Sequence, residues 1–197
     1  MAMFDDVRRG GAPAEPVYSP IARFLHWLVV ALVGVMALTG VLMVYRGKDL
    51  NILDALTINL YSTHKALGLV VLAVVVIRLV YRLFAGRPDD EPSLTPFQKI
   101  ASHTVHWALY GLLIAIPIGG WLGVSLFPAL DVFGLFQLPA LASPDKALSE
   151  QVLWVHGLAA YLLLGLIAIH IGAALYHHFV RRDGVLARMM PGRKRDI

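Results

Sequence analysis

Residues 24–45 read FLHWLVVALVGVMALTGVLMVY, a run of 22 residues without a charged side chain. At a rise of about 1.5 Å per residue, a helix of this length crosses the roughly 30 Å hydrocarbon core of a bilayer. The run begins late in the chain, is longer than the apolar region of a usual signal peptide and lacks an obvious A-x-A exit. We therefore expect a membrane-spanning helix and not a cleaved signal peptide.

Three further apolar segments follow. The second, at about 61–84, has a short uncharged centre between Lys65 and Arg78, whose long side chains can reach the polar interface. The third and fourth are uncharged over residues 100–130 and 151–180. We therefore predict an all-α integral membrane four-helix bundle, with helices at about 22–45, 61–84, 102–126 and 151–180.

The rest of the chain is organised around these segments. We expect the bundle to occupy residues 18–191, between a mobile tail at 1–17 and a basic tail at 192–197. The outer-face loop at 127–150 is long and contains several apolar side chains. We expect this loop to cap the bundle or to lie in the membrane interface.

The composition supports a membrane protein. Of the 197 residues, 58% are hydrophobic and 15% are charged, whereas soluble domains contain about 25% charged residues. The mean hydropathy of +0.68 argues against both a soluble globule and a disordered chain. The absence of cysteine excludes disulfides, thiolate zinc sites, iron–sulfur clusters and covalently attached c-type haem.

The distribution of lysine and arginine predicts the orientation. These residues gather before the first segment, between the second and third, and after the fourth, while the opposite side carries Arg46, Lys48, Lys65 and Lys146. By the positive-inside rule, both termini are expected to be cytoplasmic and the protein to be a multi-pass inner-membrane protein. The net charge of +4 is then a topology signal and an attraction to lipid headgroups, and we expect no nucleic-acid partner.

All eight histidines fall within the predicted helices or at their ends. Ionisable groups inside a bilayer are costly, so each is a candidate functional residue. His156 and His170 are 14 residues apart on one predicted helix, which places them on nearly the same face and about 21 Å apart along the axis. One side chain is therefore expected near each side of the hydrocarbon core.

Depth in the membrane pairs these histidines with two others. His26 begins its helix on the cytoplasmic side, where His170 ends its own, and His64 and His156 both begin on the outer side. Two level pairs of imidazoles in a dry bundle suit two six-coordinate b-type haems. We predict His26 and His170 as ligands of an inner haem iron, and His64 and His156 as ligands of an outer one. For a single histidine, the alternatives are a helix–helix hydrogen bond and a proton path.

Secondary candidates lie near the inner pair. His106 is level with His26 and is an alternative ligand to it. If His106 is not a ligand, His103 and His106 are candidates to bind haem propionates or to form part of a quinone or proton site. The remaining alternative is that both are ordinary histidines of the membrane interface. His177, seven residues beyond His170, is placed to contact a propionate, a quinone or headgroups. Arg78 has two interpretations. It pairs with a haem propionate or another buried acceptor, or its long side chain extends to the polar interface.

The outer side carries the only candidates for a catalytic role. Lys65, Arg46 and Lys48 are close in sequence and form a possible positive funnel for an anionic reactant, or simple interface anchors. No Asp or Glu lies inside a predicted span, which argues against a cation transporter, an acidic channel or a carboxylate-driven pump. No P-loop or Rossmann glycine pattern is present.

The order of several short motifs resembles the prokaryotic cytochrome b561 family, from Tyr18 to Pro191. These motifs are Tyr18-Ser19-Pro20 to His26-Trp27, the helix start at His64, Ala101 to Tyr110, the fourth-helix histidines, and His177-His178 through Asp183 to Arg188-Met189-Met190-Pro191. The resemblance implies four membrane helices and two b haems, with ligands from the first, second and fourth helices. It also implies electron exchange between the quinone pool and an outer-face partner.

These observations lead to a first functional hypothesis and its rivals. The first is a membrane dihaem cytochrome that transfers electrons between a periplasmic reactant and quinone, in its most specific form an oxidoreductase that oxidises superoxide and reduces ubiquinone. The donor would be superoxide or a periplasmic redox protein. The second is a haem-bearing anchor subunit that passes electrons for a partner oxidoreductase without catalysis of its own. A histidine-based metal or proton transporter is a third class.

Overall fold

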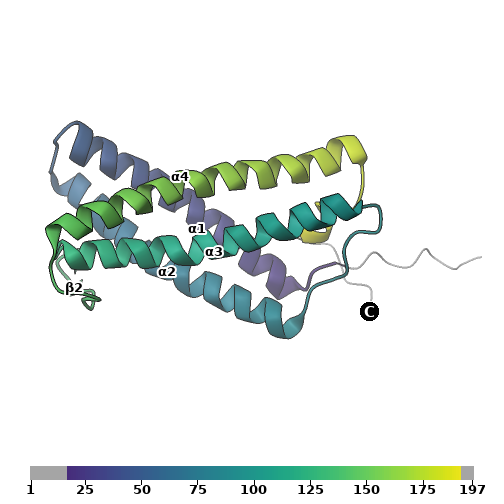
Figure 1. The fold of residues 1–197 in the computed structure, drawn as a ribbon, viewed down its shortest axis with the longest axis horizontal. Helices are drawn as coiled ribbons and strands as arrows, with labels where there is room; N and C mark the ends of the chain where they lie inside the picture. Colours follow the sequence, from purple (N-terminus) through teal and green to yellow (C-terminus); the bar gives the residue numbers. More distant parts are fainter. Residues whose placement is uncertain (1–16, 192–197) are drawn as a thin grey trace, which may run out of the picture.

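The computed structural model describes residues 17–191, which form four long helices (Figure 1). These are α1 (Pro20–Val44), α2 (Ala55–Ala85), α3 (Pro96–Leu126) and α4 (Lys146–Tyr176). Short π-helical turns, η2 (Tyr45–Asp49) and η3 (His177–Arg181), extend α1 and α4, and a 3-10 turn, η4 (Ala187–Met189), follows. All four helices are long and apolar enough to cross a membrane. The predicted all-α membrane four-helix bundle is confirmed.

Three helices begin five or six residues earlier than predicted, at Ala55, Pro96 and Lys146. The side chain immediately before each helix caps it: Asp54 accepts a hydrogen bond from the backbone of Thr57, Thr95 from Gln98, and Asp145 from Leu148. Such caps satisfy backbone N–H groups that have no partner within the helix. The prediction started from the longest uncharged runs and did not use these capping side chains. The α-helical part of the fourth helix ends at Tyr176, before the predicted end at residue 180. The π-turn η3 continues it to Arg181.

The helices pack in chain order, with α1 against α2, α2 against α3, and α3 against α4. Their shared core contains six buried residues: Val29, Val71, Val75, Tyr110, Leu113 and Leu163. Within residues 17–191, α4 makes no comparably extensive backbone contact with α1 or α2. Side chains therefore span the distance between α4 and these two helices.

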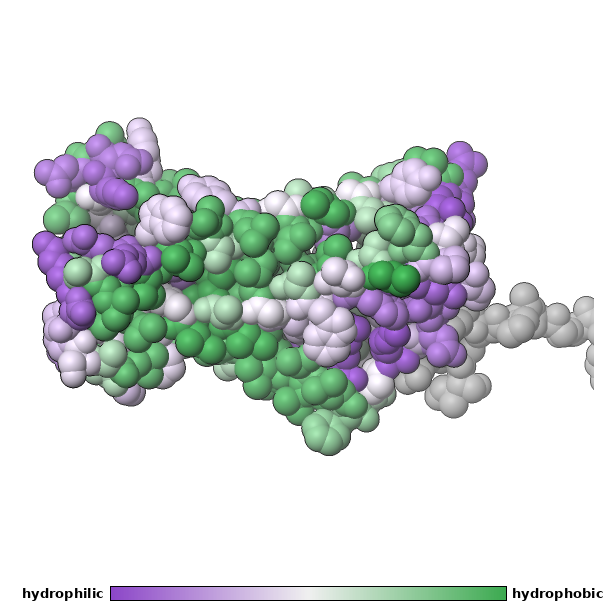
Figure 2. Space-filling view, in the orientation of Figure 1, coloured by the Kyte–Doolittle hydropathy of each residue, from purple (hydrophilic) through white to green (hydrophobic). Residues whose placement is uncertain are grey.

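The outer surface is apolar around the middle of the bundle and polar at both ends (Figure 2). Many large apolar side chains point outward, among them Leu38, Leu83 and Leu162. An apolar belt between two polar ends is expected where lipid is the solvent.

The two ends of the bundle differ in structure. Both ends of the described chain lie at one end, which we call the terminal end; the backbone N–H of Tyr18 donates to the carbonyl of Arg188 there, at 3.3 Å. At the opposite, hairpin end, strands β1 (Asp131–Val132) and β2 (Phe136–Gln137) pair antiparallel (Figure 1). The predicted tails at 1–17 and 192–197 lie outside the described residues except for Val17, which is buried.

Candidate functional site

Two pairs of histidines face each other across the bundle. The ring centroids of His26 on α1 and His170 on α4 are 6.3 Å apart, with an interplanar angle of 71°. Those of His64 on α2 and His156 on α4 are 6.2 Å apart, with an angle of 80°. The structure thus brings together both pairs proposed from the sequence, with nearly the same geometry.

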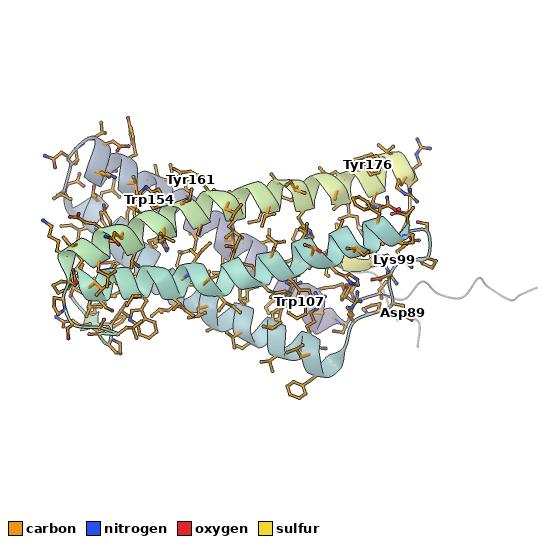
Figure 3. All side chains as sticks on the ribbon, in the orientation of Figure 1. Asp89, Lys99, Trp107, Trp154, Tyr161 and Tyr176 are labelled. Carbon is orange, nitrogen blue, oxygen red and sulfur yellow. The ribbon has the colours of Figure 1, made fainter. Side chains whose placement is uncertain are left out.

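The two pairs lie at different levels along α4. This helix is unbroken from Lys146 to Tyr176, so the 14 residues between His156 and His170 place the pairs about 21 Å apart. The pair with His26 is nearer the terminal end, and the pair with His64 is nearer the hairpin end. Figure 3 shows the direction of α4: Trp154 lies toward the hairpin end, and Tyr176 lies toward the terminal end.

The spacing within each pair suits a metal ion held between two imidazoles. Two metal–nitrogen bonds of about 2.0 Å, together with the halves of the two rings, separate the ring centroids by roughly 6 Å. A haem iron takes two axial ligands from the protein and its other four from the porphyrin. The residues present therefore fit two bis-histidine haems, one at each level.

The ring of His156 is held in one orientation by α3. Its Nδ1 lies 2.9 Å from the backbone carbonyl oxygen of Ile116. A carbonyl only accepts hydrogen bonds, so Nδ1 carries the proton and Nε2 is the nitrogen left for a metal. His64 has a weaker partner, the hydroxyl of Thr39, at 3.3 Å from its Nδ1.

Glycines make room for both rings at the hairpin end. A Cβ atom added to Gly120 on α3 would lie 2.9 Å from Cε1 of His156, and one added to Gly40 on α1 would lie 3.1 Å from Cε1 of His64. The first distance is too short for carbon atoms in contact, and the second is tight. Close approach of each ring to the neighbouring helix therefore depends on glycine.

A third histidine lies beside the terminal-end pair. The ring centroid of His106 on α3 is 5.1 Å from that of His170, closer than His26 is. Its Nδ1 donates to the carbonyl of Ser102, one turn earlier, at 2.6 Å. The spacing of His26 from His170 matches that of the other pair, whereas the spacing of His106 does not.

The other two secondary histidines bond to carboxylates outside the helices. Nε2 of His103 lies 3.0 Å from Oδ1 of Asp90, and Nδ1 of His177 lies 2.6 Å from Oδ2 of Asp183. The hydrogen bond from His103, and then the nearby Arg87, lower the pKa of Asp90. Burial acts to raise the pKa of Asp183, but the bonds that it accepts from His177, Val185 and Arg181 outweigh burial and lower it.

Two arginines lie next to the terminal-end pair. The guanidinium groups of Arg78 and Arg82 stack over the ring of Tyr110 at 5.4 and 5.5 Å, and Arg82 also lies 5.8 Å from the ring of Trp107. Both arginines line a pocket with His106. Among residues 17–191, no carboxylate lies within 4 Å of either guanidinium. This pocket thus offers two positive charges and aromatic walls beside His170.

The cationic residues at the hairpin end have partners of different kinds. Arg46 forms an ion pair with Asp54 at 2.6 Å and donates to the hydroxyl of Thr57 at 3.1 Å. The bond from the Thr57 backbone, together with Arg46, lowers the pKa of Asp54. Lys48 forms no ion pair with any residue in the described part of the chain.

Lys65 is engaged with the loop at the hairpin end. Its ammonium group donates to the backbone carbonyl of Ala129 at 3.0 Å and to that of Asp131. The sequence suggested part of a positive funnel for an anionic reactant, or an interface anchor, at this position. The structure shows instead that Lys65 binds the loop between α3 and α4, a contact that no sequence motif indicates.

Comparison with known proteins decides the family. The family model described as prokaryotic cytochrome b561 matches residues 17–192, nearly the whole chain. The chain belongs to the prokaryotic cytochrome b561 family. The resemblance seen in the sequence motifs is thereby confirmed.

Several known proteins are similar to this chain over almost their full length. Cytochrome b561 homolog 2 of Escherichia coli (strain K12) is 32% identical over 174 residues, covering 88% of this chain and 90% of the relative. The probable superoxide oxidase CybB of Yersinia pestis is 28% identical, covering 90% and 97%. Cytochrome b562 of Cereibacter sphaeroides is 30% identical, covering 89% and 96%.

Membership in the cytochrome b561 family establishes the general activity. The protein is a multi-pass bacterial membrane protein of electron transfer, and the family implies haem b as its cofactor. The two histidine pairs are the residues of this chain whose chemistry and spacing fit that cofactor.

Proposed function

We propose that this cytochrome holds two b haems, one at each end of the bundle. His26 and His170 would hold the haem iron at the terminal end, and His64 and His156 would hold the one at the hairpin end. The single observation that carries this proposal is the equal spacing of the two pairs, 6.3 and 6.2 Å between ring centroids. Arg78 and His106 contact the terminal-end haem or its propionates, because both line the pocket beside His170.

The terminal end is the cytoplasmic end in this proposal. Lysine and arginine gather in the segments at this end of the chain, as the positive-inside rule requires for cytoplasmic segments. The hairpin end then faces the periplasm, and the protein resides in the inner membrane. Electrons pass between a periplasmic reactant at the hairpin end and ubiquinone in the membrane.

Superoxide is the proposed periplasmic reactant. Two superoxide anions each lose one electron and become O2, while one ubiquinone gains two electrons and two protons and becomes ubiquinol. The role of the bound haems is to carry these electrons across the bundle. The proposal is supported by the relative named as a probable superoxide oxidase and by the cations Arg46, Lys48 and Lys65 at the hairpin end.

A spectroscopic and kinetic experiment on the purified protein tests this function. We expect a reduced-minus-oxidised spectrum with low-spin b-type bands, two haems per chain, and superoxide consumption coupled to ubiquinone reduction. One haem per chain would overturn the dihaem assignment. Two haems without any acceleration of superoxide loss, measured with ubiquinone present, would overturn the superoxide assignment alone.

A second candidate function is that of an electron-transfer subunit for a partner oxidoreductase. The observation that favours it is the exposed apolar tip of the hairpin end, formed by Phe133, Leu135 and Phe136. Leu135 is 81% exposed there. If the protein purified alone reduces ubiquinone from superoxide at full rate, this candidate is excluded. If activity requires a second polypeptide from the same membranes, it is supported.

A further inference from the structure

The helices that carry each histidine pair do not pack closely on one another. His170 and His156 lie on α4, whose extensive packing is with α3, while His26 and His64 lie on α1 and α2. Direct packing of these helices therefore does not by itself set the spacing of each pair, and contacts beyond the shared side-chain core can help to hold it. Two segments at the ends of the bundle are placed to do so: residues 182–191, which we name the terminal strap, and residues 127–145, which we name the hairpin cap.

The terminal strap binds the start of α1 through three successive carbonyl groups. The carbonyl of Arg188 accepts from the backbone N–H of Tyr18 at 3.3 Å. That of Met189 accepts from the indole N–H of Trp27 at 3.0 Å, and that of Met190 from the guanidinium of Arg23 at 2.9 Å. The chain segment that leaves α4 is thus fastened to the helix that carries His26.

A carboxylate fixes the other end of the strap to η3, the turn that extends α4. Asp183, whose side chain is 8% exposed, accepts from Nδ1 of His177 at 2.6 Å and lies 3.4 Å from Nε of Arg181. Its second oxygen accepts from the backbone of Val185 at 3.2 Å. The left-handed conformation of Arg182, at a φ of 55°, turns the chain back toward the bundle.

Trp27 connects the strap to the ligand itself. Its indole lies edge-on to the imidazole of His26, with 5.5 Å between ring centroids and an angle of 75°. The structure shows no hydrogen bond to the ring of His26 from the described residues, unlike His64, His106 and His156. Metal-ligating histidines are normally oriented by a neighbouring group, and here the fixed indole of Trp27 is in that position.

The hairpin cap makes the equivalent connection at the other end. Ser62 and Lys65 flank His64 on α2, and both bind the cap. The hydroxyl of Ser62 accepts from the backbone of Phe133 at 3.1 Å, and Lys65 donates to the carbonyls of Ala129 and Asp131. Val132 lies in the cap next to Asp131 and Phe133, and its side chain is fully buried, with 0% exposed.

Where the cap ends, the start of α4 is fastened to the end of α3. The backbone N–H of Asp145 donates to the carbonyl of Leu126 at 3.0 Å. The hydroxyl of Ser149, in the first turn of α4, donates to the carbonyl of Gly123 at 2.9 Å. The cap therefore joins α2, which carries His64, to the junction of α3 with the end of α4 that carries His156.

We propose that the terminal strap and the hairpin cap are positioning elements, each of which sets the spacing and ring orientation of the histidine pair at its own end. This inference rests on the proposed haem ligation. Trp27 and Asp183 are positioning residues for the terminal-end haem, and Ser62 and Lys65 for the hairpin-end haem. Lys65 then affects the haem site in two ways: its bonds to the cap help to position His64, and its positive charge lies near the site.

The test is whether damage to one element changes only one haem. In holoprotein, Trp27→Phe and Asp183→Asn should each shift the low-spin electron paramagnetic resonance signal and the midpoint potential of the terminal-end haem alone. Lys65→Met and Ser62→Ala should do so for the hairpin-end haem alone, and Lys65→Arg should restore the wild-type signal. His170→Ala and His156→Ala, each of which removes one haem, assign the two signals.

Matched variants separate positioning from a general loss of stability. Trp154→Phe removes an exposed indole with no hydrogen bond to the described residues, and Lys48→Met removes a cation at the same end as Lys65; both should leave the two spectra unchanged. The proposal is overturned if strap and cap variants change neither haem, or change both equally. If Lys65→Met fails to fold, Ser62→Ala alone decides the outcome for the cap. A wild-type protein without two low-spin haems would instead overturn the proposed function.

Discussion

Nδ1 of His156 on α4 donates to the carbonyl oxygen of Ile116 on α3, at 2.9 Å. The bond fixes the tautomer of the imidazole and leaves Nε2 free to bind a metal, and the centroid of the His64 ring lies 6.2 Å away. It is possible only because position 120, one turn beyond Ile116, is glycine. The packing of α3 on α4 therefore determines the orientation of a histidine that we propose as a haem ligand.

The first prediction concerns this glycine. In Gly120→Ala, the new methyl group would lie 2.9 Å from Cε1 of His156, so the ring must move. We expect the affinity of the hairpin-end site for haem to fall by about 10-fold or more, the usual size of effects on residues that orient a ligand. Haem content per chain, with titration of released haem, measures this change.

Gly119→Ala is the matched control for that substitution. No atom lies within 4 Å of a Cβ added at position 119, so this variant changes helix propensity in the same way without contact with His156. It should keep both haems. Equal haem loss from the two variants would show that helix stability, and not the position of the ring, is responsible.

The second prediction separates His26 from His106 as partner of His170. The ring of His26 has the same spacing from its partner as the hairpin-end pair, and that of His106 is about one ångström closer, 5.1 against 6.3 Å. We expect His26→Ala to lose the terminal-end haem and His106→Ala to keep it with a shifted spectrum. Haem quantification and paramagnetic resonance of both variants give the answer. The opposite result would assign the iron to His106.

The histidine pairs show how far the sequence alone reaches. The 14-residue interval on one helix and the alternation of helix direction predict which histidines share a level, because both follow from helix geometry. The partners of those histidines depend on how neighbouring helices rotate and on the path of a loop. For this reason the bond of Lys65 to the hairpin cap and the contact of Gly120 with His156 were not predicted.

The third prediction concerns the charge of Arg78. Its guanidinium lies in the pocket beside the terminal-end pair and has no carboxylate partner among the described residues. A nearby positive charge stabilises the reduced form of a haem, so Arg78→Gln should lower the midpoint potential of the terminal-end haem. Potentiometric titration of the two haems checks this. Arg87→Gln, which removes an arginine paired with Asp90 in the α2–α3 connection, should leave both potentials unchanged.

The fourth prediction concerns attraction of superoxide to the hairpin end. Lys48 has no ion pair in the described residues, whereas Arg46 is paired with Asp54, so Lys48 contributes the less compensated charge. We expect Lys48→Gln to slow superoxide consumption several-fold at low ionic strength and to reduce its dependence on salt. Lys99→Gln makes the same change of charge at the terminal end (Figure 3) and should have no effect on either quantity. Equal slowing by both variants would show that net charge alone matters.

The last prediction uses the acid dependence of the terminal strap. Burial of Asp183 acts to raise its pKa, but the bonds from His177, Val185 and Arg181 prevail and lower it. A carboxyl whose pKa is lower in the folded state stabilises that state above its unfolded pKa of about 3.9, and this stabilisation is lost as the pH falls through the folded pKa. Asp183→Asn should therefore lower the thermal stability of the terminal-end haem signal at pH 7. As the pH falls from about 4 through the lower folded pKa of Asp183, the wild-type and variant curves should converge. A difference that stays constant from neutral to acid pH would show that the charge of Asp183 does not hold the strap.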